Sequence, residues 1–325
     1  MTRVAVAHYP EGAGHATRML AVARALEDRG ASVALAGGGP GERFVRQLGY
    51  DEYVPTSVDY VADYQERGGL RAVLTNSLPD SARRLRDFAG WLRREDPDAL
   101  LTDDMFAAMA AGLTRTPLFV LTHNAPGFYR DAVERWGASA LTLLQRALSR
   151  AFFYPAVWPR HPRDPAGVTR VGPVALTGTG DADPDPAEVG VLVSPSTYSD
   201  DLEAVAERLR DAGETVTLVG GPDWEPVPAL LPYVRAASAV VCPGYSTAME
   251  AAVAGTPCVL YPFTTEQHGV ARFVRETGAR GFAVAETVDA AVAAARDPPP
   301  GAPRENAAGP VADAVIADLG GGGAA

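Results

Sequence analysis

The sequence predicts an α/β protein made of two halves, each with a parallel β-sheet covered by helices. Short apolar segments typical of strands alternate with segments whose apolar residues recur at helical spacing, and such alternation implies parallel sheets. The Gly/Asp/Pro-rich stretch 178–186 interrupts this alternation, which then restarts. A chain of 325 residues is long enough for two domains of medium size. We therefore expect one domain over residues 1–172 and another over residues 173–325.

The first half starts with a strand, a Gly-rich loop, a helix and a second strand, which together make one βαβ unit. The strands of this unit are expected over residues 4–7 and 31–36, and the helix over 16–29. The later elements expected in this half are a helix over 81–95, a strand over 99–102, a helix over 107–113, a strand over 117–122, a helix over 131–152 and irregular chain over 154–170.

The second half repeats this alternation of strands and helices. Its expected strands cover residues 189–194, 214–219, 239–241 and 258–261, and its expected helices cover 199–212, 228–235, 246–254, a segment ending at Gly278, and 311–319.

Composition narrows the class of function. The formal charge is −11 and no lysine occurs, so the chain lacks the positive surface that non-specific nucleic-acid binding requires. An acidic surface with Arg in place of Lys favours a halophilic protein, although a GC-rich genome would give the same bias. No signal peptide and no apolar run long enough for a membrane span is found, so we expect a cytoplasmic protein. The spacing of potential ligands suggests no metal site, and we expect no cofactor.

Residues 242–282 form the most informative stretch, CPGYSTAMEAAVAGTPCVLYPFTTEQHGVARFVRETGARGF. It reads as two βα turns in succession, and the first helix opens with Ser246 and Thr247. The free N–H groups and positive dipole at a helix start suit a phosphate. Glu250 lies a turn further on, and Glu266-Gln267 follow the next strand.

This stretch resembles the donor-binding region of glycosyltransferases with the GT-B fold, two Rossmann-like doubly wound domains facing a cleft. The branch of UDP-sugar transferases that makes the lipid-linked peptidoglycan precursor is the most similar. The resemblance implies that a nucleotide-sugar donor binds to the residues Gly244, Ser246, Thr247, Glu250, Glu266, Gln267, Ser194 and Gly220. Within this set Glu250 would bind the ribose. One departure is that Cys242-Pro243 stands where many relatives have His-Gly.

The loop after the first strand carries a second signal. Gly12-Ala13-Gly14-His15 would let a ligand approach the backbone closely, and a histidine there suits general-base chemistry. The resemblance implies that His15 deprotonates an acceptor hydroxyl. Asp103 or Asp104, at the end of another strand, could orient the imidazole, or could cap the helix that follows. The candidates for acceptor or phosphate contact are Gly12, Gly14, Arg18 and His123.

The sequence therefore predicts an inverting, metal-independent glycosyltransferase with a UDP-sugar donor, for example UDP-N-acetylglucosamine. The acceptor is unknown, and a lipid-linked one is an option. The Arg-rich helix 82–94 could rest on anionic lipid at the inner face of the membrane, or could pack its apolar stripe into the core. Two alternatives remain open: a UDP-sugar 2-epimerase of the same fold, and a non-catalytic partner subunit of a transferase.

Overall fold

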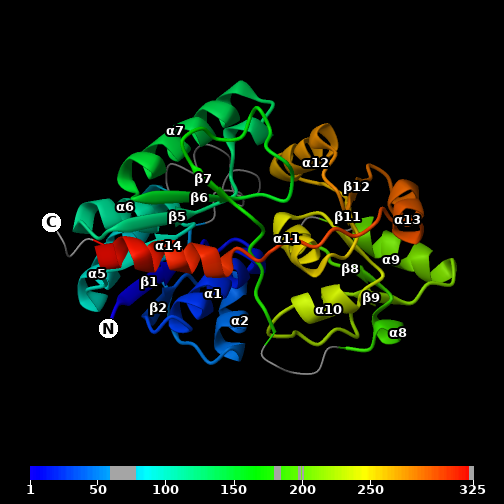
Figure 1. Ribbon diagram of the computed structural model, residues 1–325, viewed down its shortest axis with the longest axis horizontal. Helices are drawn as coiled ribbons and strands as arrows, with labels where there is room; N and C mark the ends of the chain where they lie inside the picture. Colours follow the sequence, from blue (N-terminus) through cyan, green and yellow to red (C-terminus); the bar gives the residue numbers. More distant parts are fainter. Residues whose placement is uncertain (59–77, 179–183, 197–198, 200, 322–325) are drawn as a thin grey trace. The chain divides into compact units, whose positions relative to one another are not determined.

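The chain forms two β-sheets flanked by helices (Figure 1). The computed structural model describes residues 1–58, 78–178, 184–196, 199 and 201–321. The strands of the first sheet are β1 (Arg3–Ala7), β2 (Ser32–Ala36), β3 (Glu52–Tyr53), β4 (Ala99–Thr102), β5 (Leu118–Leu121), β6 (Ala151–Pro155) and β7 (Thr169–Val171). The helices linked to it are α1 (Ala13–Glu27), η1 (Gly39–Gly41), α2 (Glu42–Gln47), α5 (Leu78–Glu95), α6 (Met105–Thr114), η3 (Pro126–Phe128) and α7 (Ala132–Leu148).

The second sheet consists of β8 (Val191–Val193), β9 (Val216–Leu218), β10 (Ala239–Cys242), β11 (Cys258–Leu260) and β12 (Phe282–Val284). Its helices are α8 (Pro186–Val189), α9 (Asp201–Asp211), α10 (Leu231–Ala236), α11 (Tyr245–Ala254), α12 (Thr265–Thr277) and α13 (Val288–Arg296), and α14 (Ala308–Gly321) follows them.

Both sheets are doubly wound. The first has the order β3-β2-β1-β4-β5-β6-β7, and the pairs from β3 to β6 are parallel. The second has the order β12-β11-β10-β8-β9, and all its pairs are parallel. In each sheet the chain runs outward from a central strand, returns, and continues toward the other edge. The predicted fold class is therefore confirmed.

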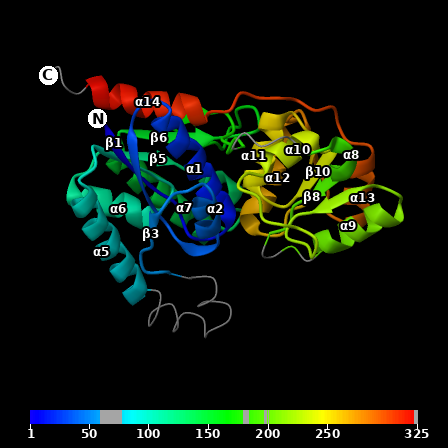
Figure 2. The ribbon, with the colours of Figure 1, turned by 90° about the horizontal axis from the view of Figure 1, so that it is seen from below.

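Strands buried on both faces explain why the sequence reads as continuous apolar runs. The four residues of β4 and the four of β5 are all buried, as expected for parallel strands covered by helices on both sides. In the second sheet, α9 and α13 pack together on one face, and α10 and α11 pack together on the other (Figures 1 and 2). Val205 and Leu209 of α9 join Val193 and Val241 in the core on the first of these faces.

The chain divides into two compact units. Unit 1 comprises residues 1–122, 143–153 and 312–325, and unit 2 comprises residues 123–142 and 154–311. These units differ from the predicted halves in three places. Residues 123–142 and 154–172 belong to unit 2, and the end of the chain belongs to unit 1. Within unit 1, Asp313 of α14 binds Arg29, and Asp318 binds Arg150.

The expected helix over residues 131–152 is too long. Helix α7 ends at Leu148, and residues 151–155 form β6. The apolar run Ala151–Pro155 was compatible with either structure, and pairing with β5 decides in favour of a strand. The region expected to be irregular holds the end of β6 and the short strand β7.

The Arg-rich helix α5 packs its apolar stripe into the core. Phe88, Trp91 and Leu92 are each at most 2% exposed, which agrees with the alternative that the stripe is core-facing. The structure therefore favours the core-facing alternative over a lipid contact made by these side chains.

Candidate functional site

Loops that meet at the centre of the first sheet hold the predicted catalytic residues. Strands β1 and β4 are neighbours, and Ala7 pairs with Thr102 at their carboxyl ends. The chain leaves β1 toward α1 and leaves β4 toward α6, so this is the point at which the winding of the sheet reverses. Ligands of doubly wound sheets bind at such switch points. The Gly-rich loop follows β1, and Asp103 follows β4.

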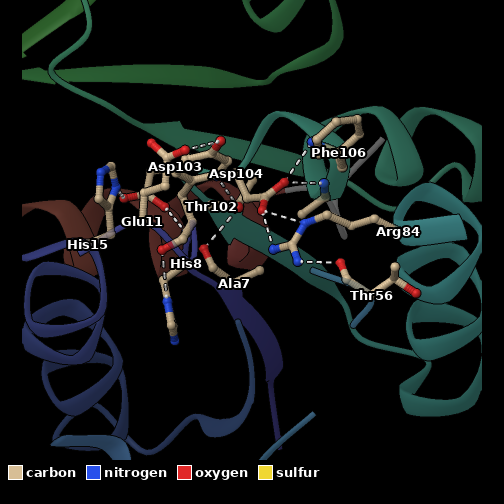
Figure 3. Close-up of polar contacts among 12 residues, drawn as sticks. Ala7, His8, Glu11, His15, Thr56, Arg84, Thr102, Asp103, Asp104 and Phe106 are labelled. Carbon is tan, nitrogen blue, oxygen red and sulfur yellow. Dashed lines mark hydrogen bonds and ion pairs between the residues drawn. The ribbon is translucent and has the colours of Figure 1, made fainter. Parts of the chain in front are cut away.

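His15 and Asp103 form a hydrogen-bonded pair at this switch point. The Nδ1 atom of His15 lies 2.8 Å from Oδ2 of Asp103 (Figure 3). The His15 side chain is 26% exposed, whereas the Asp103 side chain is fully buried. Helix α1 begins at Ala13, so His15 lies in its first turn. The residue before the helix, Gly12, is the N-cap and has a backbone φ of 79°. When Nδ1–H donates to Asp103, Nε2 carries the lone pair that can accept a proton.

Three donors hold the Asp103 carboxylate. The backbone N–H of Tyr9 donates to Oδ1 at 2.8 Å, and Arg18 Nη2 donates to Oδ2 at 2.5 Å beside His15. Burial alone would raise the pKa of Asp103. The positive charges and hydrogen bonds of His15 and Arg18 outweigh burial and hold the pKa well below its usual range. Arg18 is 3% exposed, and this position fits contact with Asp103 better than the expected phosphate contact.

Asp104 points the other way. Its Oδ1 atom accepts the backbone N–H groups of Phe106 and Ala107, which makes it the N-cap of α6. Its Oδ2 atom binds Arg84, with Nη2 at 2.6 Å, and Figure 3 shows the two side chains directed toward each other. Burial raises the pKa of Asp104, although its contacts with Arg84 oppose the shift. The geometry supports the capping alternative for Asp104 and leaves Asp103 as the partner of His15.

The second sheet has its own switch point, between β8 and β10. Ser194 follows β8, and α11 begins after β10. The Oγ atom of Ser194 lies 3.4 Å from Oγ1 of Thr247 in the first turn of α11. The N-cap residue Gly244 provides no side chain to bind the first N–H groups of the helix, and Ser246 is half-buried nearby. The structure thus brings together four predicted donor residues at a helix N-terminus.

Glu250 lies on α11 with 6% of its surface exposed. Burial raises its pKa to about 8, and no charge or hydrogen bond from the described residues offsets this effect. A buried carboxyl group without a partner is costly once it is ionised. Two hydroxyl donors, such as those of a ribose, would lower that cost.

The side chains of Glu266 and Gln267 bind different partners in the structure. The Oε1 atom of Gln267 accepts the backbone N–H groups of Phe263 and Thr264, which closes a capping box at the start of α12. Glu266 instead binds His123, whose Nε2 atom lies 2.6 Å from Oε1 of Glu266 within unit 2. His123, predicted on the acceptor side, is therefore a neighbour of a predicted donor residue.

Some contacts could not be read from the sequence. The ring of Tyr245 stacks on His123 with centroids 4.0 Å apart, and the Tyr245 hydroxyl donates to the carbonyl of Pro155. These residues are far apart in the chain, so no local pattern marks them.

Two predicted glycines lie at the ends of strands or helices. Gly220, with φ of 79°, makes the turn after β9, and Gly14 lies inside the first turn of α1.

Cys242 faces the interior of its sheet. Its Sγ atom is 3.6 Å from Sγ of Cys258 on the neighbouring strand, and both residues are fully buried. The contact with Cys242, together with burial, raises the pKa of Cys258 well above its usual value. The side chain that replaces the histidine of many relatives is thus part of the core.

Among the described residues, no group of three His, Cys, Asp or Glu side chains is arranged to hold a metal ion. No helix in this part of the chain is long and apolar enough to cross a membrane.

Comparison with known proteins finds relatives that are named glycosyltransferases. No family model matches it. It is 22% identical to an uncharacterised glycosyltransferase of Methanosarcina mazei over an alignment that covers 82% of each protein. A second uncharacterised glycosyltransferase, of Methanosarcina acetivorans, is also 22% identical, with 82% of both proteins covered.

Solved structures are similar over nearly the whole chain. The glycosyltransferase SsfS6 of Streptomyces sp. SF2575, complexed with thymidine diphosphate, is 16% identical with a TM-score of 0.65, covering 99% of this chain and 96% of that one. The spinosyn rhamnosyltransferase SpnG, complexed with thymidine diphosphate, is 15% identical with a TM-score of 0.63, covering 98% and 96%. The chain has the GT-B fold, and the proteins that it resembles in sequence and in structure are glycosyltransferases.

Proposed function

We propose that this chain transfers a sugar from a nucleoside-diphosphate sugar to an acceptor hydroxyl. The observation that carries the proposal is that each predicted site lies at the switch point of its own sheet. The His15–Asp103 pair lies between β1 and β4 in unit 1, and the N-terminus of α11 lies between β8 and β10 in unit 2. Ligands of doubly wound sheets bind at such points. The homologues named glycosyltransferase and the GT-B fold support the same reading.

In the proposed reaction, His15 acts as the general base. Its Nε2 atom takes the proton of the acceptor hydroxyl while the hydroxyl oxygen attacks the anomeric carbon. The bond between that carbon and the diphosphate breaks, so the configuration inverts. Asp103 fixes the tautomer and stabilises the imidazolium that forms, as an aspartate does in hydrolytic triads.

The departing diphosphate would be held by the start of α11. Three kinds of group converge there: backbone N–H groups without partners inside the helix, the hydroxyls of Ser246 and Thr247, and the positive end of the helix dipole. Donors fixed in advance around a developing negative charge lower the barrier to its formation. This arrangement supports a transfer that proceeds without a metal ion.

The donor that we propose first is a UDP-sugar such as UDP-N-acetylglucosamine, from the pattern of residues 242–282. Two of the structural neighbours were solved with thymidine diphosphate, so dTDP-sugars are tested in parallel. The lysine-free, acidic composition supports the proposal that the protein functions in a cytoplasm of high salt concentration.

Calorimetric titration with UDP, dTDP and GDP in molar salt tests the donor site. Saturable binding of one nucleotide, lost in Glu250→Ala and kept in the surface variant Glu286→Ala, would support the assignment. Equal binding by both variants would contradict the proposed role of Glu250 in the donor site. Absence of binding by all three nucleotides would favour a non-catalytic partner subunit. Incubation with UDP-N-acetylglucosamine alone identifies an epimerase, because an epimerase needs no acceptor.

A further inference from the structure

We propose that the exposed apolar face of helix α7 docks this protein on an anionic lipid surface. The sequence suggested a lipid contact for α5, whose apolar stripe is buried. Helix α7 instead carries an apolar face that is open to solvent. Such a contact is independent of the proposed sugar transfer, so each can be tested without the other.

The polarity of α7 is inverted. Of the eight large apolar side chains that are exposed among the described residues, five are on this helix: Val133, Trp136, Leu143, Leu144 and Leu148. Val133 is 77% exposed and Trp136 is 74% exposed, whereas the buried residue of the helix is the polar Gln145, at 5%. A surface helix normally turns its apolar face to the core. Here that face points to solvent.

The exposed residues of α7 form one continuous stripe. Val133, Trp136, Ala140, Leu143 and Ala147 recur at steps of three and four, which places them on the same side of the helix, and all five are exposed. The stripe lies along a single helix, so its geometry follows from that helix alone (Figure 1). A contiguous apolar surface of this kind marks a binding site, which isolated apolar side chains do not.

The charges beside the stripe suit a negatively charged partner. Arg135 and Arg146 are exposed and lie three turns apart along the same edge of the helix. Residues 130–150 hold four arginines against two acidic residues, a net charge of +2, in a chain whose formal charge is −11. The apolar face is therefore bordered by positive charge on a protein that is acidic overall.

An anionic lipid surface fits this face better than a second copy of the chain does. Helices with Trp and Leu on one side and arginines on the other lie in the plane of the bilayer interface, where lipid phosphates supply the opposite charge. In an antiparallel pair of two copies, like edges of α7 would meet, so Arg135 and Arg146 would face the same arginines. Two chains of charge −11 would also repel each other.

Co-sedimentation with vesicles tests the contact. Wild type, Leu143→Glu and the control Val54→Glu are mixed with vesicles of phosphatidylcholine, with and without phosphatidylglycerol. Val54 is likewise exposed, at 51%, but lies outside α7. We expect wild type and Val54→Glu to bind, and more tightly when phosphatidylglycerol is present at low salt. Leu143→Glu should bind at least about tenfold more weakly, because a charge replaces an apolar side chain that would enter the lipid.

Tryptophan fluorescence identifies the surface that meets the lipid. Trp91 and Trp158 are at most 2% exposed, whereas Trp136 on α7 is 74% exposed. Anionic vesicles should therefore shift the wild-type emission to the blue as Trp136 leaves water. In Trp136→Phe this shift should disappear while sedimentation persists, because phenylalanine keeps an apolar ring at the same position.

No sedimentation of the wild type with anionic vesicles, or equal binding by Leu143→Glu and Val54→Glu, would overturn the proposal. A wild-type dimer in light scattering that becomes a monomer in Leu143→Glu, without vesicle binding, would assign the face to a second copy. If Leu143→Glu fails to fold in thermal unfolding, Val133→Glu takes its place. These measurements need no turnover, so vesicle binding by a chain that transfers no sugar would count against the proposed function alone.

Discussion

The Nε2 atom of His123 lies 2.6 Å from Oε1 of Glu266, although the two residues are 143 positions apart. The imidazole also stacks on Tyr245, the first residue of α11. His123 thus connects the segment after β5 with the starts of α11 and α12, all within unit 2. It is placed to orient Glu266 in addition to any contact with the acceptor.

His123→Ala should weaken binding of the intact nucleotide sugar more than binding of the free nucleotide. We expect Glu266, one of the donor-site candidates, to contact the sugar part of the donor, and it loses a hydrogen-bonded neighbour in this variant. Calorimetry on His123→Ala, Glu266→Gln and the double variant measures the coupling between the two residues. We expect a coupling of roughly 1 kcal/mol, since the residues are in contact. Strictly additive losses would show that His123 does not act through Glu266.

Asp103→Asn and Asp104→Asn should differ in their effect on activity. Asp103→Asn removes the charge opposite His15, so the turnover rate should fall by a factor of about 10² to 10⁴. It also takes the carboxylate from the buried Arg18, so the free energy of unfolding should fall as well. Asp104→Asn takes the carboxylate from the buried Arg84, so it should lower the free energy of unfolding by roughly 3 kcal/mol without a specific loss of turnover. Initial rates and thermal unfolding of both variants measure these effects. Equal losses of activity at equal stability would contradict the separation of their roles.

Parts of the fold with local signals could be predicted from the sequence. The Gly-rich loop after β1 and the turn before α11 combine a strand, a glycine and a helix start within a few residues, so both were found. The start of β6 was assigned to a predicted helix and its end to irregular chain, because an apolar run becomes a strand only when a neighbouring strand pairs with it. The two-residue strand β3 carries no pattern of its own.

The site shows the same limit. Sequence reasoning placed both Asp103 and Asp104 after β4, but local spacing cannot say which carboxylate turns toward His15. That choice depends on Arg84, which draws Asp104 toward α5. Arg18 was predicted as a candidate for acceptor or phosphate contact, and only the meeting of α1 with the loop after β4 shows that it binds Asp103.

The two buried cysteines should resist thiol reagents while the protein is folded. Cys242 and Cys258 are fully buried, and the pKa of Cys258 is raised by its contact with Cys242 and by burial. A thiol reacts through its thiolate, so both factors slow the reaction. Labelling with a chromogenic disulfide should proceed at the rate of unfolding and accelerate in denaturant. A rapid native phase of one thiol equivalent would show that the strand pair opens locally.

Glu250→Gln should stabilise the protein at high pH and have little effect at low pH. The pKa of Glu250 rises from 4.5 to about 8 on folding because of burial. Below the unfolded value both states are protonated, and the carboxyl imposes no pH-dependent cost. Between the two values the folded state holds more protons than the unfolded state, so wild-type stability falls as pH rises. Above the folded value the full cost, on the order of 4 kcal/mol, is present.

The glutamine side chain has nearly the same shape and carries no charge, so the variant should escape that cost. Urea unfolding at about pH 5 and about pH 9 measures the difference in the free energy of unfolding between variant and wild type, which should grow by several kcal/mol across this window. The surface variant Glu286→Gln provides the baseline. A difference that is constant with pH would mean that the Glu250 carboxylate has a partner or solvent in solution. Saturating nucleotide should shrink the difference at about pH 9, since ribose hydroxyls would then bind the carboxylate.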